Sequence, residues 1–121
     1  MDVPFDSPEL LATLELSMLD TFDELPFGLI VMDRRGYVIG YNAFEAHLSG
    51  LDVDRVIGRN FFETVGPCTN NYLVAQRYLD EPDLDELLDF TFTLRMAPMP
   101  VKLRLMARAG SDRQYLAVQP R

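Results

Sequence analysis

The last third of the chain alternates apolar and polar residues, and this pattern restricts the fold more than any other feature of the sequence. Segment 89–96, "DFTFTLRM", alternates four apolar with four polar side chains. Segment 101–108, "VKLRLMAR", repeats the alternation after the turn "APMP", and segment 114–119, "QYLAVQ", follows the turn "AGSD". A period of two is typical of strands with one buried face. The pattern therefore predicts three neighbouring antiparallel strands.

Two more strands and several short helices are expected earlier in the chain. "FGLIVMD" (27–33) and "YVIGY" (37–41) flank the turn residues "RRG", as in a β-hairpin. The order strand, strand, helices and three strands predicts an α+β domain, with a five-stranded antiparallel sheet and short helices on one face. The helical segments expected between the second and third strands are 42–50, 52–58, 60–65 and 71–81.

The N-terminal region is expected to form a helical cap. A helix is predicted from Ser7, as N-cap, to Met18, with Leu10, Leu11, Leu14 and Met18 on one side. The stretch 20–25, "DTFDEL", is interpreted as a linker. We therefore expect an N-terminal cap over residues 1–24 and a core domain over residues 25–121.

Composition and charge exclude several classes of function. The chain has 121 residues, 19 acidic and 11 basic, for a net charge of −8. Such a surface repels phosphate backbones and anionic lipids, so neither nucleic acid nor a membrane is an expected partner. No apolar run approaches the ~20 residues of a membrane span, and the N-terminus does not resemble a signal peptide. With a single cysteine, which precludes an internal disulfide, a cytoplasmic location is expected.

That cysteine, Cys68, lies between Pro67 and Thr69. A lone cysteine commonly packs as a small apolar side chain. A zinc site needs about four ligands, and His47 is the chain's only histidine. A thiol enzyme would need His47 to activate Cys68 and a third group to orient the histidine, and no such arrangement is indicated. A flavin adduct would need the motif "GRNC", whereas this chain has Phe61 at its last position. Packing and covalent attachment of a ligand both remain open from the residues alone.

Tyr41 and Glu45 are four residues apart, so a helix that begins near Asn42 brings them to one side. Burial in an apolar pocket raises the pKa of a carboxyl group because its charged form loses solvation. The neutral acid can then donate a hydrogen bond. In the alternative interpretation, Asn42 and Glu45 form a capping box and Tyr41 is a core aromatic residue.

Four motifs carry a resemblance to a known family. They are "YNAFE" (41–45), "VIGRNFF" (56–62), "PCT" (67–69) and "FTFTLRMAP" (90–98). Through them the chain, from about residue 27 to 118, resembles the photoactive yellow protein (xanthopsin) family of the PAS superfamily. The resemblance implies a PAS fold, with the cap added at its N-terminus.

The resemblance also implies a cofactor and the residues that hold it. The cofactor is p-coumaric acid, attached as a 4-hydroxycinnamoyl thioester to Cys68. Tyr41 and Glu45 would donate hydrogen bonds to its phenolate, and Ser49 would support the tyrosine. Leu51 stands where the family commonly has an arginine, so no cation is available from that position. The residues expected to form the pocket or to assist recovery are Leu51, Phe61, Phe62, Pro67, Thr69, Phe92 and Met96.

The function implied is that of a blue-light photoreceptor and not of an enzyme. Trans-to-cis isomerisation would be followed by proton transfer from Glu45, leaving a buried carboxylate at a cost of several kcal/mol. Because domains are stable by only ~5–15 kcal/mol, this cost would drive partial unfolding, beginning with the N-terminal helix. The chain, a monomer or weak dimer, would signal to an unknown downstream protein. The alternative is a chromophore-free PAS module that binds a partner protein or a small ligand.

Overall fold

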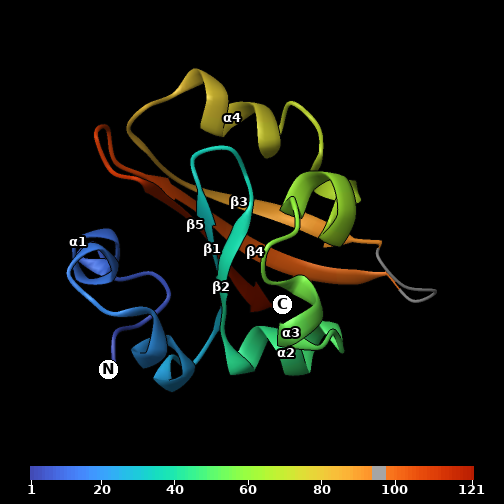
Figure 1. Cartoon of the computed structure of the whole chain (residues 1–121), viewed down its shortest axis with the longest axis horizontal. Coiled ribbons are helices and arrows are strands. Elements are labelled where there is room, and N and C mark those ends of the chain that lie inside the picture. The colour runs from blue at the N-terminus through green and yellow to red at the C-terminus, as the bar shows by residue number, and fades with distance from the viewer. Residues whose placement is uncertain (94–97) are drawn as a thin grey trace.

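Five strands form one antiparallel sheet with the order β2-β1-β5-β4-β3. This is seen in a computed structural model that describes residues 1–93 and 98–121 (Figure 1). The predicted α+β fold, with five antiparallel strands and several short helices, is confirmed. The strands are β1 (Gly28–Asp33), β2 (Val38–Tyr41), β3 (Leu84–Phe92), β4 (Met99–Ala107) and β5 (Arg113–Pro120).

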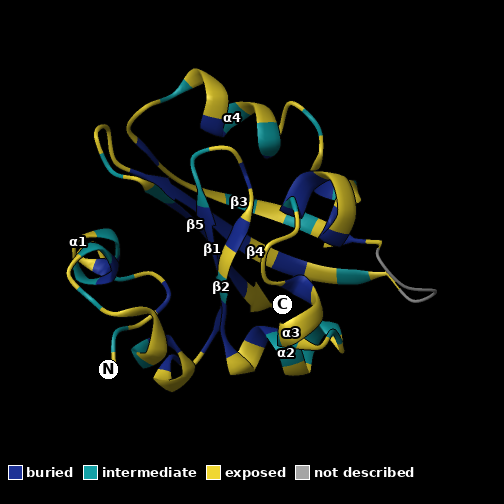
Figure 2. Ribbon diagram, viewed as in Figure 1, coloured by how far each residue is buried: buried dark blue, intermediate teal, exposed yellow. Residues whose placement is uncertain are grey.

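The sheet separates two apolar clusters, because alternate residues of each strand point to opposite faces. On β1, Ile30 and Met32 belong to one cluster, whereas Leu29 and Val31 belong to the other. Strands β1 and β5 pair along the whole of β1, and buried positions gather on these central strands (Figure 2). Both faces of the sheet are therefore covered by other parts of the chain.

The first face carries the helices between β2 and β3. The best defined is α2, because the Asn42 side chain accepts a hydrogen bond from the Glu45 N–H at 3.0 Å and Gly50 ends the helix with φ 73°. Asp52 caps α3 in the same way. The elements are α2 (Ala43–Ser49), α3 (Val53–Val56), the π-helical turn η2 (Phe61–Val65), the 3₁₀ turn η3 (Pro67–Thr69) and α4 (Ala75–Asp80).

The second face is covered by the N-terminal segment, residues 1–24, which contains α1 (Leu10–Glu15) and the 3₁₀ helix η1 (Leu19–Glu24). Its buried side chains include Phe5, Leu10, Leu14 and Phe22, which pack on the sheet. In Figure 1 this segment, in blue, lies on the other side of the strands from α3 and η2.

The predicted N-terminal helix, Ser7 to Met18, is wrong in extent. The Ser7 hydroxyl accepts from the Glu9 N–H at 3.2 Å in a turn before α1, which spans only Leu10–Glu15. Met18 is 71% exposed, with an extended backbone that redirects the chain. The expected linker is the helix η1, because Phe22 from this stretch is buried against the sheet.

Strand β3 begins at Leu84 and not at residue 89. Its first half, "LDELL", does not alternate cleanly, but it pairs in continuous register with β4, from Leu84 opposite Ala107 to Phe92 opposite Met99. The predicted strand positions 94 to 96 lie outside the described residues. Among the helices of the described part of the chain, none is long and apolar enough to span a bilayer.

Candidate functional site

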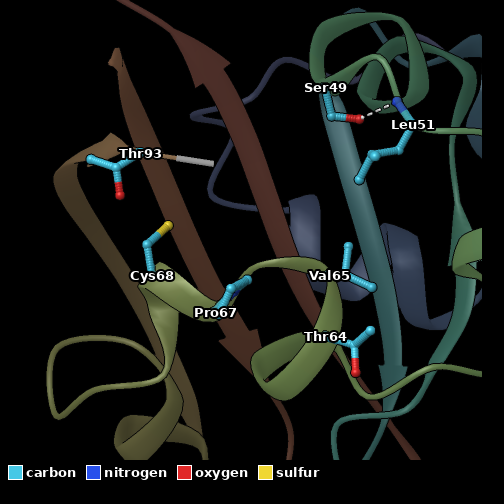
Figure 3. A pocket seen from close by; sticks show the side chains of 7 residues that line it. All are labelled: Ser49, Leu51, Thr64, Val65, Pro67, Cys68 and Thr93. Carbon is cyan, nitrogen blue, oxygen red and sulfur yellow. Dashed lines mark hydrogen bonds between the residues drawn. The ribbon is translucent and has the colours of Figure 1, made fainter. Parts of the chain in front are cut away.

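A pocket of about 540 Å³ opens on the helical face of the sheet. Its walls come from three parts of the chain: the end of α2 and the following loop, the segment from η2 to η3, and the end of β3. In Figure 3, Cys68 lies on one side of the pocket, and Ser49 and Leu51 lie on the other. The lining residues are Ser49, Leu51, Thr64, Val65, Pro67, Cys68 and Thr93.

The Cys68 thiol is half-buried at the middle of η3. The Asn71 side chain donates to the Cys68 carbonyl at 3.0 Å, and the buried Thr69 hydroxyl donates to the Gly66 carbonyl at 2.6 Å. A Cβ atom at Gly66 would lie 2.7 Å from the ring of Phe61, so this turn approaches the aromatic core closely. These contacts hold the thiol at the pocket wall while leaving it accessible.

Tyr41, Glu45 and Ser49 form a polar cluster on the other side. The Tyr41 hydroxyl donates to Ser49 Oγ at 2.9 Å and lies 3.5 Å from Glu45 Oε2. Ser49 Oγ also accepts from the Leu51 N–H at 3.2 Å. Ser49 lines the pocket, and Tyr41 and Glu45 lie behind it in buried positions. The expected spacing of four residues does bring the tyrosine and the acid together.

Glu45 is only 4% exposed, and burial raises the pKa of its carboxyl group to about 8. The hydrogen bond from Tyr41 opposes this shift but is the smaller effect. Burial also raises the pKa of Tyr41, with a further contribution from Glu45. Glu45 Oε1 is buried without a hydrogen-bond partner within residues 1–93 and 98–121. Burial therefore favours the neutral forms of the acid and of the phenol, and each neutral group can donate a hydrogen bond.

Gly28 provides the space for this acid. A Cβ atom at position 28 would lie 2.1 Å from Glu45 Oε1 and 3.2 Å from its carboxyl carbon. The first distance is far below van der Waals contact and the second is tight, so a side chain at position 28 would displace the carboxyl group. The buried position of Glu45 thus depends on a glycine in β1.

The capping-box interpretation of Glu45 is wrong. Asn42 does cap α2 through its side chain, but its own N–H donates to the Leu29 carbonyl at 3.1 Å instead of to Glu45. The Asn42 amide also donates to the carbonyls of Phe22 and Phe27. The Glu45 carboxyl group is therefore free of a capping role.

The other expected pocket residues occupy different places. Leu51 and Pro67 line the pocket, whereas Phe61, Phe62 and Phe92 lie in the apolar cluster against which Cys68 packs. The Thr69 side chain is fully buried, and Met96 lies outside the described residues.

The lining residues Thr64, Val65 and Thr93 were not among those expected from the sequence. The first two precede the Gly-Pro turn that leads into Cys68, and Thr93 directly follows the last residue of β3. Proximity to the cysteine motif could have indicated Thr64 and Val65. Thr93 is brought to the pocket only by the sheet.

These residues fit a covalently held ligand with an anionic end. The volume lies within the ~300–1,000 Å³ of typical ligand pockets. A thiol is available at one wall, and a hydroxyl group connected to a buried, neutral acid lies at the other. The unpartnered oxygen of that acid marks a polar group that the protein alone does not satisfy in its described part.

Solved structures identify the fold as that of a PAS domain. The photoactive yellow protein domain of a sensor histidine kinase from Rhodospirillum centenum matches with a TM-score of 0.80 and 39% identity, covering 89% of this chain and 97% of that domain. A PAS domain of an HTR-like protein from Haloarcula marismortui, at 22% identity, has a TM-score of 0.63 over 95% of this chain and 100% of that domain, and supports the fold alone.

Curated relatives identify the family within this class. The photoactive yellow protein of Halochromatium salexigens is 31% identical over 97% of this chain and 96% of the relative. That of Rhodothalassium salexigens is 32% identical over 80% of each chain. A scan against protein-family models found no match. The chain belongs to the photoactive yellow protein family.

Proposed function

We propose that the protein is a blue-light photoreceptor that carries p-coumaric acid as a thioester on Cys68. The observation that carries the proposal is the buried Glu45 carboxyl group, neutral at pH 7 because its pKa is about 8 and unsatisfied at Oε1 within the described residues. It belongs to the cluster that reaches the Cys68 pocket through Ser49. A buried polar atom without a partner costs stability, so its presence favours a role in holding a ligand.

Cys68 would hold the group at one end, and Tyr41 and Glu45 would hold it at the other. When bound, the chromophore supplies absorption of blue light and isomerisation about its vinyl bond. Glu45 and Tyr41 would each donate a hydrogen bond to a negative oxygen, and such charge-assisted bonds are short and strong. Because Leu51 carries no charge, the negative charge would be stabilised by neutral donors from this cluster.

Ser49 would set the direction of these bonds. Its oxygen accepts from the Leu51 N–H, and its hydroxyl group also carries one proton that it can donate. If Ser49 donates to Tyr41, the Tyr41 proton becomes available to the pocket. Burial keeps that proton on Tyr41, because the pKa of the phenol is raised well above neutral pH.

Glu45 would provide the signal by passing its proton to the negative oxygen to which it had donated a hydrogen bond. Deprotonation leaves a carboxylate in a site where burial penalises charge, at a cost of several kcal/mol. That cost is a large part of the stability of an ordinary domain. The structure would then rearrange, and a signalling partner would recognise the rearranged state. No substrate is converted in this scheme, so the protein acts as a receptor and not as an enzyme.

Reconstitution tests the proposal. The purified chain is mixed with an activated ester of p-coumaric acid, and we expect a visible absorption band, a mass increase of one coumaroyl group on Cys68 and bleaching under blue light. The matched control Cys68→Ser should stay colourless. A colourless wild-type protein would contradict the proposal and favour a PAS module without this chromophore.

A further inference from the structure

Arg104 is a buried cation on the face of the sheet opposite the pocket. Along β4, Leu103 and Leu105 point into the cluster that surrounds the pocket. Met106, two residues after Arg104, points to the N-terminal segment. The Arg104 side chain is 7% exposed, and burial of a charge is costly unless it is paired and hydrogen-bonded.

All three guanidinium nitrogens of Arg104 are engaged. Nε donates to Asp85 Oδ1 at 2.8 Å and Nη2 donates to Asp85 Oδ2 at 2.9 Å, which makes a bidentate ion pair with β3. Nη1 donates to the Phe5 carbonyl at 3.0 Å and to the Ser7 carbonyl at 2.6 Å. One side chain therefore joins β3, β4 and the N-terminal segment.

The two sets of bonds depend on each other because the guanidinium group is planar and rigid. A displacement of Asp85 that the guanidinium follows turns Nη1 away from the two carbonyls. Asp85 is accessible enough to move, since its side chain is 40% exposed. The carbonyls of Phe5 and Ser7 lie 99 and 97 residues from Arg104 in the sequence, so these contacts tie the N-terminal segment to a strand from the last quarter of the chain.

Strand β3 connects this cluster with the pocket. It carries Asp85 at its second residue, and Thr93, which lines the pocket, follows its last residue. Between these points β3 pairs with β4 without a register shift. If β3 moves as a unit, a displacement of its end at Thr93 therefore also displaces Asp85.

We propose that Arg104 is a positioning residue that fastens the N-terminal segment to the sheet, and that the Arg104–Asp85 pair releases this segment when β3 is displaced at the pocket. The fastening is a property of the protein without its chromophore. The light-driven release rests on the proposed function.

Hydrogen exchange of the chromophore-free protein tests the fastening. Arg104→Lys keeps the charge but loses the bidentate fork, and the control Arg108→Lys makes the same exchange at an exposed position. We expect the amides of residues 10–17 to exchange at least tenfold faster in Arg104→Lys, with β1 and β5 unchanged. Equal rates in the two variants, or equal acceleration in the central strands, would overturn the proposal.

Asp85→Asn provides a second variant at a more exposed site. It weakens the ion pair and leaves both carbonyl bonds in place, so a smaller acceleration is expected over the same residues. Combined with Arg104→Lys, it should add little, because both changes break the same contact. Full additivity would show that Asp85 acts apart from Arg104 and would contradict the role of the pair.

Blue light on the reconstituted protein tests the release. Illumination should accelerate exchange in residues 10–17 of the wild type, and Arg104→Lys should remove most of this difference because its segment is already loosened in the dark. A light response that is unchanged in Arg104→Lys would overturn the release. If no chromophore binds, the proposed function fails while the dark measurements still decide the fastening.

Discussion

Each face of the sheet buries a side chain that is usually charged at neutral pH, Arg104 on one face and Glu45 on the other, but the two are satisfied to different degrees. On the side of the N-terminal segment, the Arg104 residue as a whole is 5% exposed and its charge is matched by a carboxylate and two carbonyls. On the pocket side, Glu45 is 4% exposed, has one long contact of 3.5 Å and leaves one oxygen unpartnered within the described chain. The first arrangement holds the structure together, whereas the second stays neutral and becomes costly once charged.

The largest expected effect is a dependence of the free energy of unfolding on pH, which Glu45 should cause and Arg104 should not. The folded-state pKa of Glu45, about 8, lies above the usual carboxyl value of 4.5, so the native state binds the proton more tightly than the unfolded state. The stability that this provides is complete below pH 4.5 and is lost as the pH rises to about 8. The free energy of unfolding should therefore fall by up to about 1.4 kcal/mol per pH unit in this window.

Glu45→Gln should remove this slope. The amide is neutral at every pH. In chemical denaturation, the unfolding free energy of the variant relative to that of the wild type should therefore rise by several kcal/mol between pH 5 and 8. Glu63→Gln, at an exposed carboxyl group, is the matched control and should retain the wild-type slope. Identical slopes in wild type and Glu45→Gln would show that Glu45 is charged at neutral pH, which would end the contrast between the two faces.

Structure that depends on local sequence signals could be predicted, whereas structure that depends on contacts across the sheet could not. Helix α2 followed from local signals, since Asn42 caps it and Gly50 ends it. The sheet followed from alternation. The spacing of Tyr41 and Glu45 was enough to bring them together, but not to show that Asn42 N–H binds Leu29 and leaves the acid free. That distinction depends on where β1 lies.

The N-terminal segment was harder to predict because its structure depends on the sheet beneath it. Phe22 alone gives no sign in the sequence that it will be buried in a helix instead of lying in a linker. Arg104 occupies a position that the period of two assigns to solvent, together with Lys102. It is buried only because residues from the other end of the chain cover it. Such tertiary contacts leave no local pattern.

A smaller effect is expected from Gly28→Ala, which tests how tightly the pocket face holds its acid. The new methyl group would overlap Glu45 Oε1, and we expect a loss of about 1–3 kcal/mol in unfolding free energy, as for other overpacked sites. The acid should also turn toward water, which would reduce the pH slope. In a Glu45→Ala background the same change should cost much less, because the overlap is gone. An equal cost in both backgrounds would place the strain elsewhere.

The smallest expected effect compares one hydroxyl group from each face. Ser49→Ala removes the partner of Tyr41 at 2.9 Å and should cost about 1 kcal/mol of stability, whereas Ser49→Thr should restore it. Ser17, half-buried on the other face, donates to the Thr13 carbonyl at 2.6 Å in the last turn around α1. Such bonds back to the preceding turn add little to stability, so Ser17→Ala should be nearly neutral in the same denaturation experiment. If Ser17→Ala costs as much stability as Ser49→Ala, then the hydrogen bond in the polar cluster of Tyr41, Glu45 and Ser49 contributes no more than one at an ordinary helix end. The two faces would then not differ in this respect.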